Sequence, residues 1–179
     1  MKIGLVRHFK VKRGYPEKRF VTQKELFQWL DEYEASDIEV GETSLGSIEW
    51  KRCFASDLPR AAKTAETIYD GNIIKMKELR EVQIYPLFKR DIKLPFLLYP
   101  ILIRMAWLLK HKSQLERKAD VEKRVKAILD DILSQSDENI LIVSHGALMM
   151  FMRKELLKRG FKGPKMKTPE NGKLYVFEK

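Results

Sequence analysis

The chain has 179 residues, of which 44% are hydrophobic and 34% charged, and its formal net charge is +10. This length suits one hydrophobic core, so we expect a single domain over residues 1–179, and the composition argues against a disordered or fibrous protein. The charge would suit a nucleic-acid partner, a membrane surface or an enzyme that attracts anionic metabolites. Because acidic residues lie among the basic ones, we expect a solvated surface and no nucleic-acid partner.

The single cysteine and the first residues of the chain indicate the cellular compartment of the protein. Cys53 cannot form an internal disulfide, and a metal site built on cysteine is excluded. Charged residues already appear at Arg7 and Lys10, which is not the pattern of a signal peptide. The sequence therefore predicts a cytoplasmic protein.

The N-terminal residues 2–7 (KIGLVR) are apolar and bounded by charge, which predicts a buried strand. His8 follows directly at the carboxyl end of this strand. The next segment is basic and irregular as far as Arg19. A capping-box pattern at Thr22 and Glu25 then predicts the start of a helix of about three turns.

Residues 52–56 (RCFAS) predict a second strand, and a helix follows it. We expect Asp57 to cap this helix, whose first turn contains Pro59 and Arg60. Residues 73–74 predict another short strand, and an irregular loop is expected after it.

The most hydrophobic part of the chain is residues 94–109 (LPFLLYPILIRMAWLL). This stretch is shorter than the roughly 20 residues that cross a bilayer and contains Arg104 and two prolines, so no membrane span is predicted. A helix that is apolar on all sides is usually buried, or it forms a lid or an oligomer contact. We therefore expect residues 82–115 to be a lid or an insertion, with residues 94–109 as the contact of any homo-oligomer.

The C-terminal part repeats the alternation of helix and strand. Residues 116–134 have apolar side chains at helical spacing, and residues 138–145 (ENILIVSH) predict a buried strand that ends at His145. Gly146 opens another expected helix, and residues 174–177 predict an edge strand.

Strands that alternate with helices predict an α/β fold, a three-layer sandwich with a mostly parallel central sheet flanked by helices. Ligands of such sheets bind beyond the carboxyl ends of the strands. Because His8 and His145 each follow a predicted core strand, we expect them to lie in one crevice.

Two arginines make this crevice suitable for a phosphoryl group. Negative charge on phosphoryl oxygens needs fixed donors that stay in place through the transition state. Arg7 and Arg60 offer planar, bidentate donor pairs, and the helix N-terminus at Arg60 also favours an anion. Ion pairing with surface carboxylates is the alternative role of either arginine.

Four segments resemble the signature blocks of the histidine phosphatase superfamily, which is phosphoglycerate-mutase-like. They occur in the order typical of that family, and they are the N-terminal strand with its Arg-His pair, SDLPRAAKTAETI at residues 56–68, LRE at residues 79–81 and IVSHGALM at residues 142–149. The resemblance implies the phosphoglycerate-mutase-like fold and the small phosphatase branch of the family.

The resemblance also implies a role for each site residue. His8 would attack phosphorus and form a phosphohistidine, while Arg7, Arg60 and His145 would hold the phosphoryl oxygens. Glu81 would be the general acid, which a poor alkoxide leaving group requires, and the same carboxylate could then activate water. Glu78 is the nearest alternative to Glu81.

Two features depart from the family pattern. Phe9 stands where a glycine normally follows the Arg-His pair, so the ring either reshapes the pocket or packs beneath it. Residues 10–13 (KVKR) lack the small polar residue that often adds a phosphate contact. We predict no metal and no cofactor, because the sequence has no metal-ligand spacing and an arginine-histidine cluster repels divalent cations.

The leading hypothesis is a metal-independent phosphomonoesterase of the histidine acid phosphatase type that acts on a small anionic phosphorylated substrate. A phosphoglycerate-mutase-type phosphotransferase is the alternative within the enzyme class. A non-catalytic phospho-ligand or protein-binding module, with residues 94–109 as its contact surface, is the alternative outside it. Selectivity is expected in the basic loop after the first strand and in residues 82–115, where Lys89, Arg90 and Lys93 could meet extra negative charge.

Overall fold

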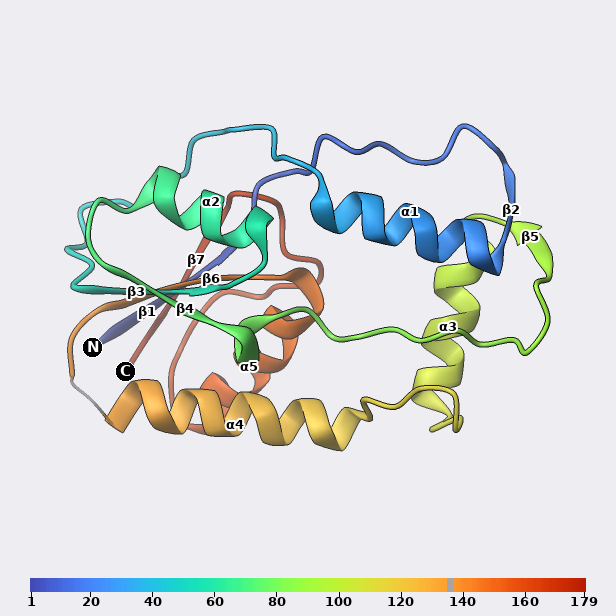
Figure 1. Cartoon of the computed structure of the whole chain (residues 1–179). Helices are drawn as coiled ribbons and strands as arrows, with labels where there is room; N and C mark the ends of the chain where they lie inside the picture. The colour runs from blue at the N-terminus through green and yellow to red at the C-terminus, as the bar shows by residue number, and fades with distance from the viewer. Residues whose placement is uncertain (135–136) are drawn as a thin grey trace.

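Short apolar segments of the chain form the middle of a five-stranded sheet, in the order β4-β3-β6-β1-β7 (Figure 1). The computed structural model describes residues 1–134 and 137–179. Its main strands are β1 (Lys2–Arg7), β3 (Arg52–Ser56), β4 (Ile73–Met76), β6 (Ile140–Ser144) and β7 (Leu174–Glu178). All five residues of β6 are buried, as expected of a strand covered on both faces.

The sheet is mostly parallel. Strand β1 pairs in parallel with β6, which pairs in parallel with β3, and β3 pairs in parallel with β4. Strand β7 runs antiparallel to β1 and closes one edge. The α/β fold and the edge strand at residues 174–177 are therefore confirmed, and the strand predicted at residues 73–74 extends to Met76.

Helices cover both faces of this sheet. Helix α2 (Pro59–Ile68) lies on one face, where Ala61 and Ala65 pack against β-strand residues such as Val143. Helices α4 (Lys118–Ser134) and α5 (Gly146–Lys158) lie on the other face (Figure 1). The predicted three-layer arrangement is thus observed.

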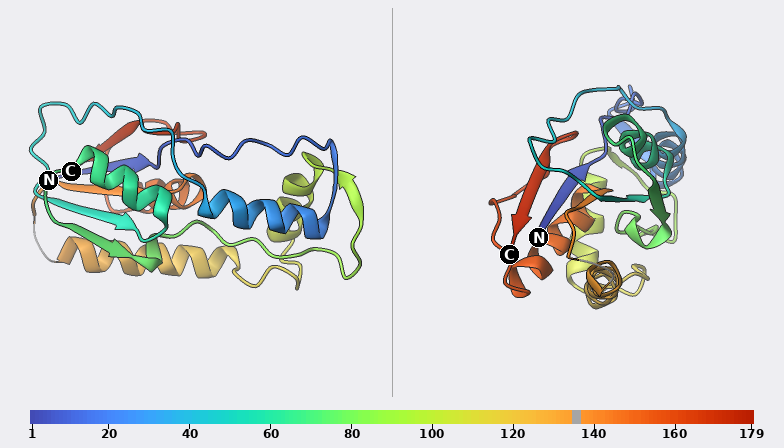
Figure 2. Two further views of the ribbon diagram at one scale, coloured as in Figure 1. Left: turned by 45° about the horizontal axis from the view of Figure 1, so that its top comes forward. Right: turned by 90° about the vertical axis from the view of Figure 1, so that its left-hand side faces the viewer.

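A second group of elements, which we call the distal lobe, lies at the end of the molecule away from both termini (Figure 2, left). It consists of β2 (Phe20–Thr22), α1 (Gln23–Ala35), β5 (Lys93–Pro95) and α3 (Leu98–Leu108), with β2 and β5 paired antiparallel. The lobe has its own buried apolar cluster, formed by Val21, Leu26, Phe96, Tyr99 and Ile103. The two short strands, β2 and β5, were not predicted.

Helix α1 begins as the sequence predicts. The Thr22 hydroxyl accepts from the Glu25 backbone N–H at 3.2 Å, and the Glu25 carboxylate accepts from the Thr22 N–H at 2.8 Å. The capping box therefore stabilises the N-terminus of α1.

The predicted cap of α2 is wrong. The N-cap residue is Leu58, which makes no side-chain capping bond. Asp57 lies one position too early and instead accepts two hydrogen bonds from Arg80, at 2.7 Å and 2.6 Å. A bidentate pair with a guanidinium outcompetes a single cap bond.

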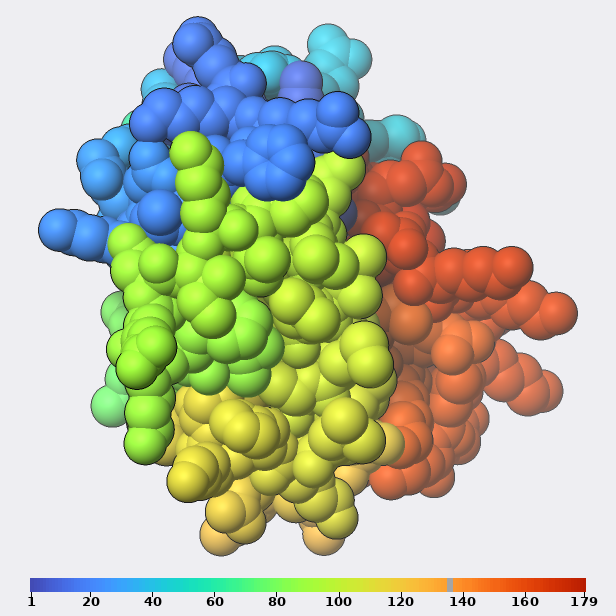
Figure 3. Space-filling view, turned by 90° about the vertical axis from the view of Figure 1, so that its right-hand side faces the viewer, coloured from blue at the N-terminus to red at the C-terminus, as the bar shows by residue number. Residues whose placement is uncertain are grey.

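The apolar stretch at residues 94–109 supplies both β5 and α3. Tyr99, Ile103 and Ala106 face the interior, whereas Leu97 and Ile101 are exposed. Figure 3 faces this end of the molecule, where the green and yellow segment fills the centre of the surface with N-terminal residues (blue) above it. Within the described residues, no helix is long and apolar enough to cross a membrane.

Candidate active site

The parallel pairing of β1 and β6 brings the two histidines together. Arg7 is the register partner of Ser144, and the His8 backbone N–H donates to the Ser144 carbonyl at 3.0 Å. His8 and His145 are therefore each the first residue after the carboxyl end of a strand, β1 for His8 and β6 for His145. Their ring centroids are 5.1 Å apart, in the crevice that the sequence predicts.

The hydrogen bond of His8 sets its tautomer. Its Nδ1 lies 2.6 Å from the carbonyl oxygen of Phe9. A carbonyl only accepts, so Nδ1 donates and Nε2 keeps the lone pair. Burial lowers the pKa of His8 from 6.5 to about 3, with Arg60 and Arg7 adding to the lowering while the bond to Phe9 opposes it. At neutral pH the ring is uncharged and Nε2 can act as a nucleophile.

His145 is held by a residue that the sequence analysis missed. Its Nε2 lies 2.9 Å from the Ser56 hydroxyl, at the carboxyl end of β3. Burial lowers the pKa of His145 well below its usual value, and the nearby Arg60 adds to this effect. The position of Ser56 in the sequence was the signal that could have found it. Ser56 is a polar residue at the end of a buried strand, and His8 and His145 directly follow the ends of two other buried strands.

Arg60 is buried without a close partner for its charge. Only 4% of this residue is exposed, and the carboxylate oxygen Oε1 of Glu34 lies 3.9 Å from Nη2. Burial lowers the pKa of Arg60. Its guanidinium also lies over the Tyr33 ring, at 5.6 Å from the centroid. The ion-pair alternative is therefore weak for Arg60, whose donors remain available to a ligand.

Buried side-chain nitrogens without partners gather at this one place. In residues 1–134 and 137–179, the buried side-chain nitrogens that lack a hydrogen-bond partner are Arg7 Nε, Arg60 Nε, Arg60 Nη1 and His145 Nδ1. Arg7 is otherwise held by a bond from Nη1 to the Pro169 carbonyl at 3.0 Å. Unpartnered buried donors are costly, so their convergence indicates a binding site for an anion.

These donors surround a cavity of about 380 Å³. Its lining includes all five residues expected at the site, which are Arg7, His8, Arg60, Glu81 and His145. Helix α1 contributes Tyr33 and Glu34, which sequence reasoning missed because neither follows a strand or belongs to a motif. Glu78 is not part of this lining.

Glu81 lies at the N-terminus of α5, beside His145. Its Oε1 accepts from the backbone N–H groups of Val82 at 2.9 Å and Leu148 at 3.0 Å, while Oε2 accepts from Ala147 at 3.1 Å. A helix N-terminus favours a carboxylate at this position. Among the described residues, Oε2 accepts only this one bond, so one of its lone-pair positions is left without a donor.

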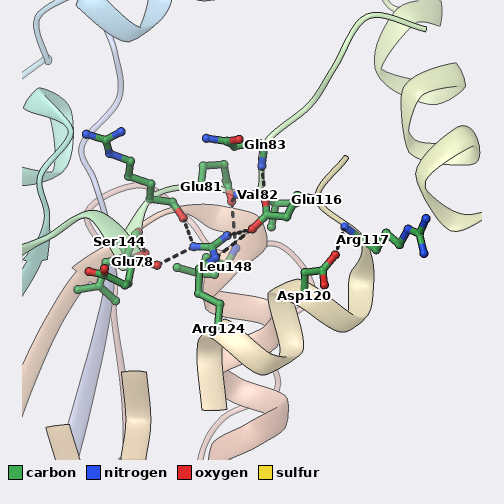
Figure 4. Close-up of polar contacts among 12 residues, drawn as sticks. Glu78, Glu81, Val82, Gln83, Glu116, Arg117, Asp120, Arg124, Ser144 and Leu148 are labelled. Carbon is green, nitrogen blue, oxygen red and sulfur yellow. Dashed lines mark hydrogen bonds and ion pairs between the residues drawn. The ribbon is translucent and has the colours of Figure 1, made fainter. Parts of the chain in front are cut away.

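An arginine of α4 holds the loop on which Glu81 lies (Figure 4). Arg124 Nη1 donates to the carbonyls of Glu78 at 2.6 Å and Arg80 at 2.8 Å, one on each side of Leu79. Its Nε and Nη2 donate to Glu116 Oε1 at 3.0 Å and 2.6 Å. We call these two residues the Arg124–Glu116 clamp.

The clamp also extends beyond Glu81. The second carboxylate oxygen of Glu116, Oε2, accepts from the Gln83 backbone N–H at 2.8 Å. The backbone is therefore held before and after Glu81 by one ion pair, which is mostly buried. Figure 4 shows these contacts converging from α4 onto the loop.

Phe9 packs away from the cavity. The ring is buried and is not part of the cavity lining. A Cβ at Gly172 would lie 2.8 Å from it, so this position, which has φ of +70°, accommodates the ring by lacking a side chain. The Phe9 backbone N–H donates to the Thr64 hydroxyl at 2.9 Å. The departure from the family's glycine therefore leaves the cavity open.

The basic residues after β1 do not face the cavity. Salt bridges join Lys10 to Glu39 at 3.0 Å and Lys12 to Asp37 at 3.3 Å on the exposed surface. The cations considered for extra negative charge, Lys89, Arg90 and Lys93, are also absent from the lining of the cavity. In the part of the chain that the structure describes, no group of three or more metal-ligating side chains could hold a metal ion.

The comparison with protein families shows to which superfamily the chain belongs. The model of the histidine phosphatase superfamily (branch 1) matches residues 30–178, so the chain belongs to this superfamily. The matched segment includes Arg60, Glu81 and His145 and begins after Arg7 and His8. The pairing of β1 with β6 is what brings the two earlier residues to the others.

Solved structures share the fold at low sequence identity. An Escherichia coli protein assigned as an alpha-ribazole-5'-P phosphatase has a TM-score of 0.62 and 15% identity, and Bacillus stearothermophilus YhfR has 0.60 and 20%. Entamoeba histolytica phosphoserine phosphatase in complex with 3-phosphoglyceric acid has 0.55 and 16%. Each comparison covers 98% of this chain and 89% of the other. No protein of curated function matches the sequence significantly.

Proposed function

We propose that this protein is a metal-independent phosphomonoesterase of the histidine acid phosphatase type, acting on a small anionic phosphorylated substrate through a phosphohistidine. The observation that supports it most is the set of unpartnered buried donors on Arg7, Arg60 and His145 around the uncharged ring of His8. Donors held in place before the reaction stabilise phosphoryl charge without a cost of reorganisation. A cytoplasmic location stays a prediction from the sequence.

In the first step, Nε2 of His8 attacks phosphorus and the ester P–O bond breaks. The alcohol oxygen takes the proton held at Glu81 Oε2 and leaves as a neutral alcohol. The ring becomes positively charged when Nε2 is phosphorylated, and the bond from Nδ1 to the Phe9 carbonyl then strengthens. Arg7, Arg60 and His145 donate to the three phosphoryl oxygens throughout.

In the second step, water attacks the phosphohistidine and the P–N bond breaks. The Glu81 carboxylate takes the proton from the water, which restores the acid for the next cycle. Inorganic phosphate leaves, and the electron pair of the broken bond returns to Nε2 of His8. The net reaction consumes one water and one phosphomonoester and needs no co-reactant.

The test compares two substrates that differ in their need for a proton. Wild type, His8→Ala and Glu81→Gln are assayed with p-nitrophenyl phosphate and with an alkyl phosphate, with and without chelator. We expect His8→Ala to lose at least about 10⁴-fold in kcat on both substrates. Glu81→Gln should lose about 10²–10³-fold on the alkyl phosphate and much less on p-nitrophenyl phosphate, whose leaving group needs no protonation.

Matched variants control for unspecific effects. His111→Ala removes an exposed histidine outside the cavity, and Glu78→Gln changes the carboxylate that is the alternative to Glu81. Both should keep activity within about threefold of wild type. Full activity in His8→Ala would refute the covalent mechanism, and loss of activity with chelator would indicate a metal enzyme. Interconversion of phosphoglycerate isomers without phosphate release would indicate a mutase instead.

A further inference from the structure

A second cavity, of about 510 Å³, adjoins the one around His8. The two cavities share five lining residues, which are Leu30, Glu81, Val82, Gln83 and Ile84. The second cavity extends from this shared border between α1 and α3 of the distal lobe, with Trp107 and Phe151 also lining it. A substrate at His8 therefore has room to extend past Glu81 into the distal lobe.

The lining of this second cavity is apolar. It includes five aromatic side chains, which are Tyr15, Trp29, Phe96, Trp107 and Phe151. Aliphatic side chains such as Leu26, Val82 and Ile103 fill much of the remainder. Such walls bind alkyl and aryl groups by removing their surface from water.

The polar groups of the two tryptophans are already used. Trp29 Nε1 donates to the Gly14 carbonyl at 2.9 Å, and Trp107 Nε1 donates to the Glu116 carbonyl at 2.8 Å. The other polar lining side chains apart from Glu81 and Tyr15 are Gln83 and Arg104, and both residues are exposed. A substrate rich in hydroxyls would lose its hydration here and find few partners in return.

Glu81 lines both cavities, and this shared position indicates which part of the substrate enters the second cavity. A proton donor must reach the leaving oxygen, so the alcohol part of the substrate has to lie next to Glu81. The phosphoryl group lies on the side of the Arg60 and His145 donors. The alcohol part therefore points toward the apolar side.

We propose that the second cavity binds the alcohol part of the substrate and that the substrates are phosphomonoesters of apolar alkyl or aryl alcohols. This inference rests on the proposed function, because it assigns the leaving group of the same reaction. It excludes sugar phosphates and phosphoserine as preferred substrates, since their polar groups have few partners in the apolar lining.

The first experiment measures kcat/KM for ethyl, butyl and hexyl phosphate. These leaving groups have nearly the same basicity, so the series isolates contact with the cavity from the chemistry of proton transfer. We expect kcat/KM to rise about two- to fourfold for each added methylene. Propyl phosphate and glycerol 1-phosphate form a second pair, with the same carbon chain and two hydroxyls of difference, and propyl phosphate should be favoured at least about tenfold.

The second experiment uses two isoleucines of nearly equal exposure. Ile84 is 41% exposed and lines the second cavity, whereas Ile92 is 40% exposed and lines neither cavity. In Ile84→Asn, the ratio of kcat/KM for hexyl phosphate to that for ethyl phosphate should fall about fivefold. Ile92→Asn should keep the wild-type ratio.

A further pair tests the wall formed by α3. Leu97 is exposed at the start of α3 and lines the second cavity, and Leu109 is exposed at its end and lines neither cavity. Leu97→Asn should lower the hexyl-to-ethyl ratio, and Leu109→Asn should not. Because both leucines are exposed, neither change removes a core contact, and a melting curve checks that each variant is folded.

The outcomes separate this inference from the proposed function. Hydrolysis that depends on His8 but shows a flat or falling dependence on chain length would overturn the apolar alcohol site alone. A preference for glycerol 1-phosphate or phosphoserine over propyl phosphate would do the same. If no phosphomonoester at all is hydrolysed, the proposed function itself fails.

Discussion

The carboxyl end of the central sheet and the distal lobe face each other across the site, and they offer different chemistry. The sheet end presents buried donors on residues that lie next to the ends of regular elements, such as His8, Arg60 and His145. The distal lobe presents mainly apolar side chains from α1 and α3. The position of a strand end is set by backbone pairing, whereas the lobe's walls depend on side-chain packing. We infer that the sheet end determines the reaction and the lobe the choice of substrate.

The largest expected effect that separates the two regions is at Arg60. Arg60→Met should lower kcat/KM about 10²–10³-fold, because a donor to the transferring group is lost. The same change should raise the free energy of unfolding by about 1–3 kcal/mol, because it removes a buried charge with no close partner. Steady-state kinetics and chemical denaturation measure the two effects.

A change at an exposed arginine provides the control for Arg60. Arg19→Met should alter neither activity nor unfolding free energy by more than about 0.5 kcal/mol, because its side chain is exposed and outside the cavity. A loss of stability in Arg60→Met would show that Arg60 acts mainly as a structural residue. The contrast between the sheet end and the lobe would then weaken.

The pH dependence of stability gives the next effect. The folded-state pKa of His8, about 3, lies below its usual value of 6.5, so the unfolded chain binds the proton more tightly. The stability associated with uncharged His8 is complete above pH 6.5 and is lost as the pH falls toward 3. Between pH 7 and pH 5, wild type should lose about 2 kcal/mol more unfolding free energy than His8→Asn.

Urea denaturation at both pH values measures this difference. His111→Asn is the matched control, since this histidine is exposed and does not line the cavity. Its pH dependence should follow that of wild type within experimental error. An equal loss in wild type and His8→Asn would mean that His8 is not held in its uncharged form by burial.

The smallest expected effect lies between the two regions, at the Arg124–Glu116 clamp. Arg124→Met removes the donors that hold the carbonyls before Glu81 and leaves Glu116 without its partner. We expect a loss of about tenfold in kcat with KM changed by less than about twofold, because positioning of the proton donor matters most in the transition state. Lys123→Met, an exposed change on the same helix, is the control.

The leaving group distinguishes positioning from a general loss of stability. In Arg124→Met, kcat should fall for an alkyl phosphate and stay near wild type for p-nitrophenyl phosphate, as expected if only protonation is impaired. An equal loss on both substrates would assign the clamp a structural role alone. The effect of Ile84→Asn on chain-length preference then tests the lobe's side of the contrast.

Much of the sheet could be predicted because its signals are local. The apolar runs at residues 2–7 and 138–145 are short and bounded by charge, so burial on both faces makes them strands of the sheet. The distal lobe could not be predicted in the same way. Its strands, β2 and β5, have three residues each, and they exist because residues 71 to 75 positions apart pair with each other.

The cap of α2 shows how a long-range contact overrides a local pattern. Asp57 precedes a helix with proline in its first turn, which by local rules predicts a cap. Arg80, which lies far along the chain, forms two hydrogen bonds with it instead. The pairing of Ser56 with His145 was equally out of reach, since 89 residues separate them.

The sequence by itself determined the fold class and the family, because strand ends and signature motifs are local features of the chain, and it predicted five site residues that line one cavity. The tertiary structure decided what those residues contact: it packs Phe9 against Gly172, places Glu81 rather than Glu78 at the cavity, and sets an apolar pocket beside it. These outcomes depend on packing between segments far apart in sequence, where shape and partners are settled only once the chain is folded.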